Sequence, residues 1–166
     1  MELCIPKTYA MAKKHHYTLT VKWTGNLGQG TAAYDLYSRD HQVKVAGKVM
    51  IPGSADPAFR GTENRYNPEE MFLSSISTCH MLWYLHLCAT KQIVVLDYED
   101  HPEGTMVETP EGSGHFTRVM LRPRVTIAEG NDTVLAAELH EEANRYCFIA
   151  NSLNFKVGHE PIIKVS

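Results

Sequence analysis

Two cysteines of this chain, Cys79 and Cys147, each lie in an apolar segment whose residue pattern predicts a helix. A cysteine thiolate is a strong nucleophile, and two thiols that meet can cycle between a dithiol and a disulfide. The two residues are far apart in the sequence, and spacing alone does not bring them together. If they meet, they could form a redox centre; if they do not, they are packing residues of a small α+β domain.

Helix geometry separates Cys79 from the next cysteine, Cys88. On one helix the two side chains point to opposite faces, about 13 Å apart along the axis. A disulfide needs Cα atoms within about 7 Å. We therefore expect Cys88 to be a small buried apolar residue and Cys4 to be inert. No pair of cysteines has the C-x-x-C spacing, which disfavours zinc-knuckle and thioredoxin-like sites.

A reactive thiol in an apolar helix needs a cation beside it, because burial raises the pKa of a thiol. Arg60 and Arg65 precede the first helix, and Glu69 could hold one of them through a bidentate pair. Cys79, an arginine and Glu69 are suited to peroxide reduction, since the guanidinium favours the thiolate and stabilises charge on the leaving oxygen. The simpler alternative is that Glu69 is a first-turn acid and Arg60 a solvated loop charge.

The first predicted helix begins at Asn67, with Pro68 at its first position and Glu70 completing a capping box. No acidic or basic residue occurs from Met71 to Thr90. The segment is long enough for a bilayer, but its serines, threonines and histidines make it too polar to span one. We expect it to be buried on all sides, and one subunit offers limited cover, so the chain is predicted to be a homodimer.

The remaining pattern predicts an α+β domain with antiparallel sheets around two central helices. The second helix is expected to begin at Asp132. Strands are predicted at residues 17–23, 31–38, 42–50, 93–98, 104–107, 115–127 and 153–165, with a loop over residues 52–66. We expect a single domain over residues 17–166, preceded by an extension at residues 1–16.

The composition narrows the classes of partner. A net charge of −3 and a pI near 6.3 argue against binding to nucleic acid or to an anionic membrane. Four cysteines are too few for a disulfide-dense secreted scaffold, and the first apolar stretch, Leu3–Ile5, is too short for a signal peptide. The expected compartment is the cytoplasm.

Two further patterns are given simpler interpretations. Cys79, Cys147 and His140 could in principle share a metal ion, but a solvated His140 on a helix surface is the commoner outcome. The glycine-rich run Gly25–Gly30 joins two predicted strands and is expected to be a hairpin loop rather than a phosphate loop. We predict no bound metal and no cofactor.

The helix start Asn67–Glu70, the small-residue run that ends in Cys79 and the distant Cys147 together resemble the OsmC/Ohr family of thiol peroxidases. Trp23–Gly25 followed by Gly30–Thr31 resembles the opening hairpin of that family. The likeness covers nearly the whole chain from residue 17. After the second cysteine, the chain has Phe-Ile-Ala where the family usually has Pro-Val-Ser.

The resemblance implies an intertwined homodimer that reduces hydroperoxides, organic ones above all. In that reading Cys79 forms a sulfenic acid, Cys147 resolves it to a disulfide, and an external dithiol restores the thiols. Glu69 is the carboxylate and Arg60 the arginine, with Arg65 as its alternative. The expected apolar lining of the peroxide pocket is Phe59, Met71, Phe72, Met81, Tyr146 and Phe148. A second hypothesis is a non-catalytic dimer of the same fold that binds a small apolar ligand between its helices.

Overall fold

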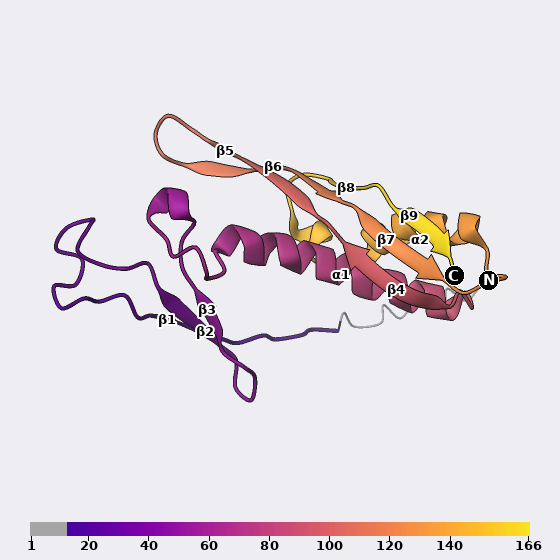
Figure 1. Ribbon diagram of the computed structural model, residues 1–166, viewed down its shortest axis with the longest axis horizontal. Coiled ribbons are helices and arrows are strands. Elements are labelled where there is room, and N and C mark those ends of the chain that lie inside the picture. Colours follow the sequence, from indigo (N-terminus) through magenta and orange to yellow (C-terminus); the bar gives the residue numbers. More distant parts are fainter. Residues whose placement is uncertain (1–12) are drawn as a thin grey trace, which may run out of the picture. The chain divides into compact units, whose positions relative to one another are not determined.

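The computed structural model describes residues 13–166, which form two compact units divided after Tyr66. Cys4 lies outside the described residues. Within the described part of the chain, no helix is long and apolar enough to cross a membrane. The predicted α+β class is confirmed (Figure 1).

The first unit contains a three-stranded antiparallel sheet in the order β1-β2-β3. The strands are β1 (Thr20–Trp23), β2 (His41–Lys44) and β3 (Ile51–Gly53), followed by a short 3₁₀ helix, Pro57–Phe59. The predicted strand 42–50 is therefore wrong in its second half, because a turn separates β2 from β3. In that turn Lys48 N donates to Val45 O at 3.1 Å.

The strand predicted at residues 31–38 is also wrong, since this segment is a compact loop. Asn26 Oδ1 accepts hydrogen bonds from Gly28 N and Gly30 N and so folds the chain at its start. The Arg39 guanidinium donates to the carbonyls of Tyr34 and Tyr37 at 2.7 Å each and lies over both rings. These contacts replace the ladder hydrogen bonds that a strand would make, because the backbone carbonyls are already satisfied.

The second unit contains two long helices and two three-stranded sheets. The helices are α1 (Pro68–Thr90) and α2 (Thr133–Tyr146). The strands are β4 (Val95–Asp100), β5 (Glu103–Glu108), β6 (Gly114–Leu121), β7 (Pro123–Ile127), β8 (Val157–His159) and β9 (Ile162–Val165), and a 3₁₀ helix spans Ala150–Ser152. Helix α1 packs on α2 and β4, and α2 also packs on β9 (Figure 1).

The two sheets have the orders β4-β7-β9 and β5-β6-β8. Pairs β4–β7 and β5–β6 are antiparallel, as predicted, and the parallel pairs β6–β8 and β7–β9 add the last two strands, a parallel pairing that the sequence did not indicate. The predicted strand 115–127 is two strands. Pro123 has no N–H to donate to a neighbouring strand, and the Arg122 amide donates to Asp100 Oδ1 at 2.7 Å instead of to a strand. The predicted last strand is likewise divided into β8 and β9.

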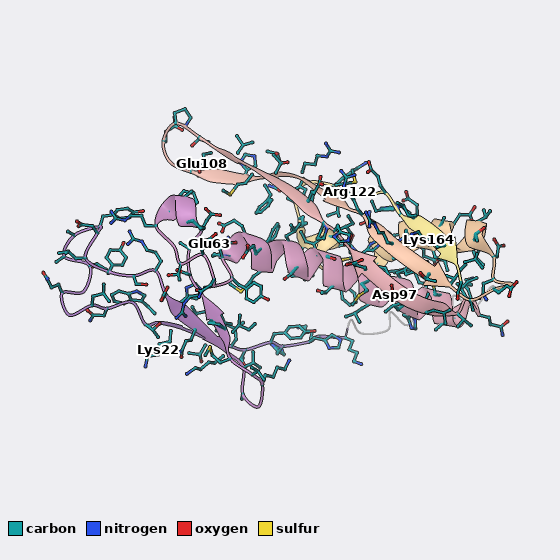
Figure 2. The ribbon with its side chains drawn as sticks, viewed as in Figure 1. Lys22, Glu63, Asp97, Glu108, Arg122 and Lys164 are labelled. Carbon is teal, nitrogen blue, oxygen red and sulfur yellow. The ribbon has the colours of Figure 1, made fainter. Side chains whose placement is uncertain are left out.

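An exposed arginine forms ion pairs with two glutamates of this unit. Arg122, labelled in Figure 2, donates to the carboxylates of Glu160 at 2.8 Å and Glu103 at 3.0 Å. Both pairs are exposed, so we assign them little net stabilisation.

The second unit has two buried apolar clusters. One joins α1, α2, β4 and β7, and the other lies between the first half of α1 and the strands β6 and β8. Only one side of α1 is covered by this unit: Ile76, Tyr84 and Leu87 are buried, whereas Ser74, Thr78, Leu82 and His86 are exposed. The prediction that α1 is buried on all sides therefore requires a further surface against that exposed stripe.

Candidate active site

Cys79 is positioned by a helix whose start follows the predicted capping box. Asn67 Oδ1 accepts from Glu70 N at 2.7 Å, and Glu70 Oε2 accepts from Asn67 N at 3.0 Å. Pro68 is the first helical residue, as expected from the sequence. Ser74, Ser75 and Thr78 return hydrogen bonds to carbonyls one turn earlier, which lets these polar side chains fit within the helix. Cys79 follows this run and is partly exposed.

Cys147 terminates α2 rather than lying within it. Asp132 caps the start of this helix, as predicted. At the other end Cys147 has φ −64° and ψ 110°, and its amide donates to Ala143 O at 2.9 Å. Its Sγ accepts from Ala150 N at 3.4 Å, and its carbonyl accepts from Asn151 N at 3.0 Å. The chain thus turns around a fully buried thiol.

The thiols of Cys79 and Cys147 contact each other across the α1–α2 interface, within the second unit. Burial first, and then the hydrogen bond with Cys79, raises the pKa of the Cys147 thiol well above its ordinary value. Cys147 therefore holds its proton more tightly than an ordinary thiol and is the hydrogen-bond donor of this pair. Cys88 is a free, buried thiol elsewhere on α1, as its position on the helix predicted.

Glu69 lies in the first turn of α1, two turns and more before Cys79. Its Oε2 atom is shielded from solvent and has no hydrogen-bond partner among the described residues. Burying a carboxylate oxygen without a hydrogen-bond donor costs free energy, so a cation or a donor beside this atom would stabilise it.

Arg60 and Arg65 both belong to the first unit. Arg65 Nε pairs with Asp40 Oδ2 at 3.3 Å, and the same carboxylate accepts from Thr62 Oγ1 at 2.8 Å. Arg60 is exposed, forms no ion pair with a described residue, and has φ 64°, an uncommon backbone conformation for a residue other than glycine. The Arg60 guanidinium lies 5.6 Å from the centre of the Tyr34 ring, so of the two arginines Arg60 is the one that is not paired with a carboxylate among the described residues.

Aromatic side chains surround the end of α2 beside the two thiols. Trp83, one turn after Cys79, stacks on Tyr146 at 5.2 Å and meets Phe148 edge-on at 5.6 Å. Tyr146 is 41% exposed and Phe148 is 70% exposed. Of the other predicted lining residues, Phe72 packs against Phe116.

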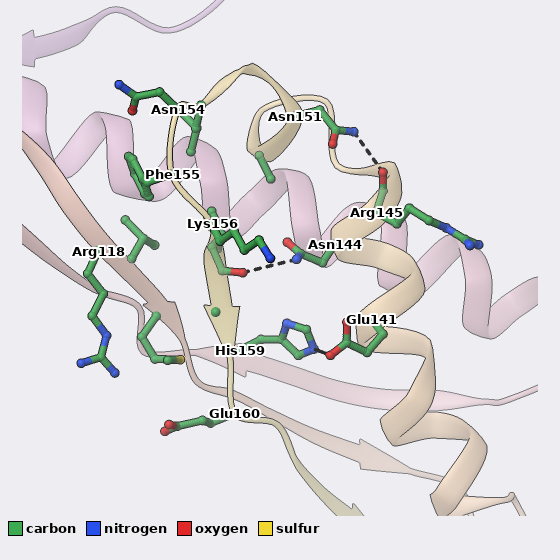
Figure 3. A pocket seen from close by; sticks show the side chains of 16 residues that line it. Arg118, Glu141, Asn144, Arg145, Asn151, Asn154, Phe155, Lys156, His159 and Glu160 are labelled. Atoms are coloured by element: carbon green, nitrogen blue, oxygen red, sulfur yellow. Dashed lines mark hydrogen bonds and ion pairs between the residues drawn. The ribbon is translucent and has the colours of Figure 1, made fainter.

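A cavity of about 1160 Å³ lies beside α2 and residues 150–160 (Figure 3), and none of the predicted lining residues borders it. Side chains from β6, α2 and the chain after Cys147 line it, both polar ones such as Asn144 and His159 and apolar ones such as Met120 and Phe155. Asn144 Nδ2 donates to Val157 O at 3.3 Å, and His159 Nε2 lies 3.4 Å from Glu141 Oε1. Because none of the predicted lining residues takes part, this cavity is not the peroxide pocket expected from the sequence.

Histidine side chains form a buried group that sequence reasoning missed. His140 was expected to be solvated, but it is fully buried and its Nδ1 lies 2.9 Å from His80 Nε2. The ring of Tyr84 stacks on His140 at 3.8 Å, and His159 lies 5.6 Å from His80 between ring centres. Among the described residues no group of three or more His, Cys, Asp or Glu side chains could hold a metal ion. The four-residue spacing of His80 and Tyr84 places both side chains on one face of α1, and this spacing could have indicated from the sequence that His80 is buried.

Acid is expected to destabilise the protein through this pair. Burial lowers the pKa of His80 from 6.5 to about 4 and that of His140 from 6.5 to about 3, with smaller effects of the neighbouring histidines. Between 6.5 and these values the unfolded chain binds more protons than the folded one. The free energy of unfolding therefore decreases as the pH is lowered through this range, by up to about 1.4 kcal/mol per pH unit for each histidine.

Urea unfolding at several pH values measures this slope. His159 lies beside the histidine pair, and Glu141 in turn lies beside His159. Tyr84 and Tyr98 also face the pair but stay neutral over this pH range, since burial raises the pKa of both tyrosines. A variant with His80→Asn and His140→Asn is the control, because it cannot take up these protons. An equal slope in the wild type and the control would contradict the assignment.

Comparisons with known proteins identify the family and relatives with the same fold. A model of the OsmC-like protein family matches residues 61–160. The solved structure of an OsmC-like protein of unknown function from Vibrio cholerae is similar with a TM-score of 0.81 and 30% identity, covering 90% of this chain and 100% of that chain. An organic hydroperoxide resistance protein from Elizabethkingia anophelis shares the fold, with a TM-score of 0.65 and 17% identity over 93% of this chain and 100% of that one. An uncharacterized Bacillus subtilis protein, YmaD, is 25% identical over 147 residues, which is 86% of this chain and 89% of that protein.

Proposed function

The chain belongs to the OsmC-like family, and from that premise we propose that it is a cysteine-based peroxidase that reduces organic hydroperoxides. The observation that carries the proposal is the contact between the thiols of Cys79 and Cys147, in which the buried Cys147 holds its proton. The name of the Elizabethkingia relative, an organic hydroperoxide resistance protein, supports the choice of substrate.

The proposed reaction has three steps. The Cys79 thiolate attacks the peroxide, the O–O bond breaks, and Cys79 becomes a sulfenic acid while the alcohol leaves with a proton. Cys147 then attacks the Cys79 sulfur, which forms the disulfide and releases water. An external dithiol finally reduces this disulfide and is itself oxidised, so the cycle needs no bound cofactor.

Arg60 and Glu69 complete the proposed site. Arg60 would stabilise the Cys79 thiolate and the negative charge that develops on the leaving oxygen. The shielded Glu69 oxygen, which lacks a partner among the described residues, would orient the guanidinium in a bidentate pair. The engagement of Arg65 with Asp40 supports Arg60 as the cation.

Replacing Arg60 with glutamine is expected to lower kcat/KM for hydroperoxide by about 100-fold, because a preorganised positive group is lost from the transition state. Arg65→Gln is the matched control: it breaks the pair with Asp40 and should change kcat/KM less than about 3-fold. Steady-state peroxide consumption measures both variants. A larger loss in Arg65→Gln than in Arg60→Gln would reverse the assignment.

We also propose that the protein acts as a homodimer. The exposed stripe Ser74, Thr78, Leu82 and His86 runs along an α1 that carries no charge from residue 71 to residue 90, which suits it to being covered. Light scattering should give twice the subunit mass of 18.7 kDa. A subunit mass at micromolar concentration would refute the dimer.

Turnover with two kinds of thiol tests the proposed function. The purified protein should consume an organic hydroperoxide catalytically with dithiothreitol, and far more slowly with a monothiol, because an intramolecular disulfide is best reduced by a dithiol. A non-catalytic dimer that binds an apolar ligand would consume no more peroxide than the buffer does. That result would overturn the proposal.

A further inference from the structure

The buried histidine pair connects the two helices that carry the thiols, and the proposed reaction does not use it. His80 belongs to α1 and is 1% exposed; His140 belongs to α2 and is 0% exposed. Their rings are nearly parallel, with centres 5.3 Å apart, and the hydrogen bond between them is 2.9 Å long. Both rings are neutral near pH 7, so one donates its N–H and the other accepts.

The pair is close to the thiols along both helices. His80 directly follows Cys79, a rise of about 1.5 Å along α1. His140 precedes Cys147 by two turns of α2, on the same face. Any shift of one helix along the other would therefore change the histidine contact and the sulfur contact together.

Apart from the contact between the two thiols, the other contacts named here between these helices are apolar or aromatic. Leu87 of α1 and Leu139 and Ala143 of α2 belong to one buried cluster, and Trp83 stacks on Tyr146. Apolar burial is non-directional, so by itself it does not set one orientation of the helices. A hydrogen bond between two rings in a low-dielectric core requires one distance and one orientation.

We propose that the His80–His140 hydrogen bond is a positioning element that holds Cys79 and Cys147 at the separation from which their disulfide closes. It contacts neither sulfur and acts through the register of α1 on α2. A displacement of about 1 Å is enough to change the rate of a positioned reaction by about 100-fold. The inference rests on the proposed pairing of the two thiols, but not on peroxide as the oxidant.

The equilibrium between the protein and dithiothreitol tests this inference. Oxidised dithiothreitol accepts two electrons from the Cys79–Cys147 dithiol, and the ratio of protein disulfide to dithiol gives the effective concentration of the two thiols. His140→Phe keeps a ring to stack on Tyr84 but removes the hydrogen bond. We expect its effective concentration to be at least about 10-fold lower than that of the wild type. His80→Phe removes the same bond from α1 and gives an independent measurement.

Two controls separate positioning from general destabilisation. His140→Asn restores a polar nitrogen near the position of Nδ1 and should recover the effective concentration to within about 3-fold of the wild type. Leu139→Ala loosens the neighbouring core and lowers the unfolding temperature, but it leaves the hydrogen bond in place and should keep the effective concentration of the wild type.

Each outcome decides a separate question. Equal effective concentrations in the wild type and both phenylalanine variants would overturn the inference, and so would a loss in Leu139→Ala as large as in His140→Phe. A wild type that forms the disulfide with dithiothreitol but does not consume peroxide would overturn the proposed function and leave this inference intact. A wild type that never forms the Cys79–Cys147 disulfide would overturn both.

Discussion

Cys79→Ser is expected to lower hydroperoxide turnover by at least about 1,000-fold, because a serine hydroxyl is not ionised near neutral pH and cannot replace the thiolate as nucleophile. The fold should be unaffected, since Cys79 is partly exposed and serine is of similar size. Peroxide consumption with dithiothreitol measures the effect, and circular dichroism checks the fold.

Cys88→Ala is the matched control for this variant. Cys88 lies on the same helix, is 1% exposed, and takes no part in the proposed reaction. Turnover should stay within a few-fold of the wild type, with a lower unfolding temperature from the small cavity. If Cys88→Ala lost activity as Cys79→Ser does, the nucleophile would be wrongly assigned.

Cys147→Ser is expected to stop the cycle after its first step. The serine hydroxyl can still accept the hydrogen bond from Ala150 N, so the turn around residue 147 should persist. One equivalent of hydroperoxide should then oxidise Cys79 to a sulfenic acid that no second thiol resolves. Dithiothreitol-dependent turnover should fall by about 100-fold, because an external thiol must replace a neighbouring one.

Trapping with dimedone and mass spectrometry measures this species. The Cys147→Ser protein should carry one dimedone adduct at Cys79 after peroxide, and the wild type should carry almost none because its disulfide forms first. A Cys147→Ser protein that still loses two thiols to one equivalent of peroxide would contradict the role of Cys147.

Local rules account for the parts of the site that the sequence predicted well. The capping box at Asn67 and Glu70, and the cap at Asp132, depend on residues within one turn, and both were predicted correctly. The same reasoning missed the compact loop at residues 31–38, because Arg39 satisfies its carbonyls from outside the predicted segment. Pro123 indicates a break in the sequence, but the predicted strand 115–127 runs across it.

Contacts between distant residues could not be read from spacing. His80 and His140 come from different helices, and nothing in the sequence indicated that they meet; His140 was expected to be solvated. The parallel pairs β6–β8 and β7–β9 likewise join segments that are separated by α2. The meeting of Cys79 with Cys147 entered the sequence account only through a family resemblance, for the same physical reason.

Mapping of the disulfide after a single equivalent of an organic hydroperoxide tests the central claim most directly. The reduced wild-type protein is treated, its remaining thiols are alkylated, and its unreduced peptides are identified by mass spectrometry. We predict that two thiols are lost together and that one linked peptide pair, containing Cys79 and Cys147, accounts for the loss. Linkage of either residue to Cys88 or Cys4, or four thiols left intact while peroxide disappears, would contradict the account.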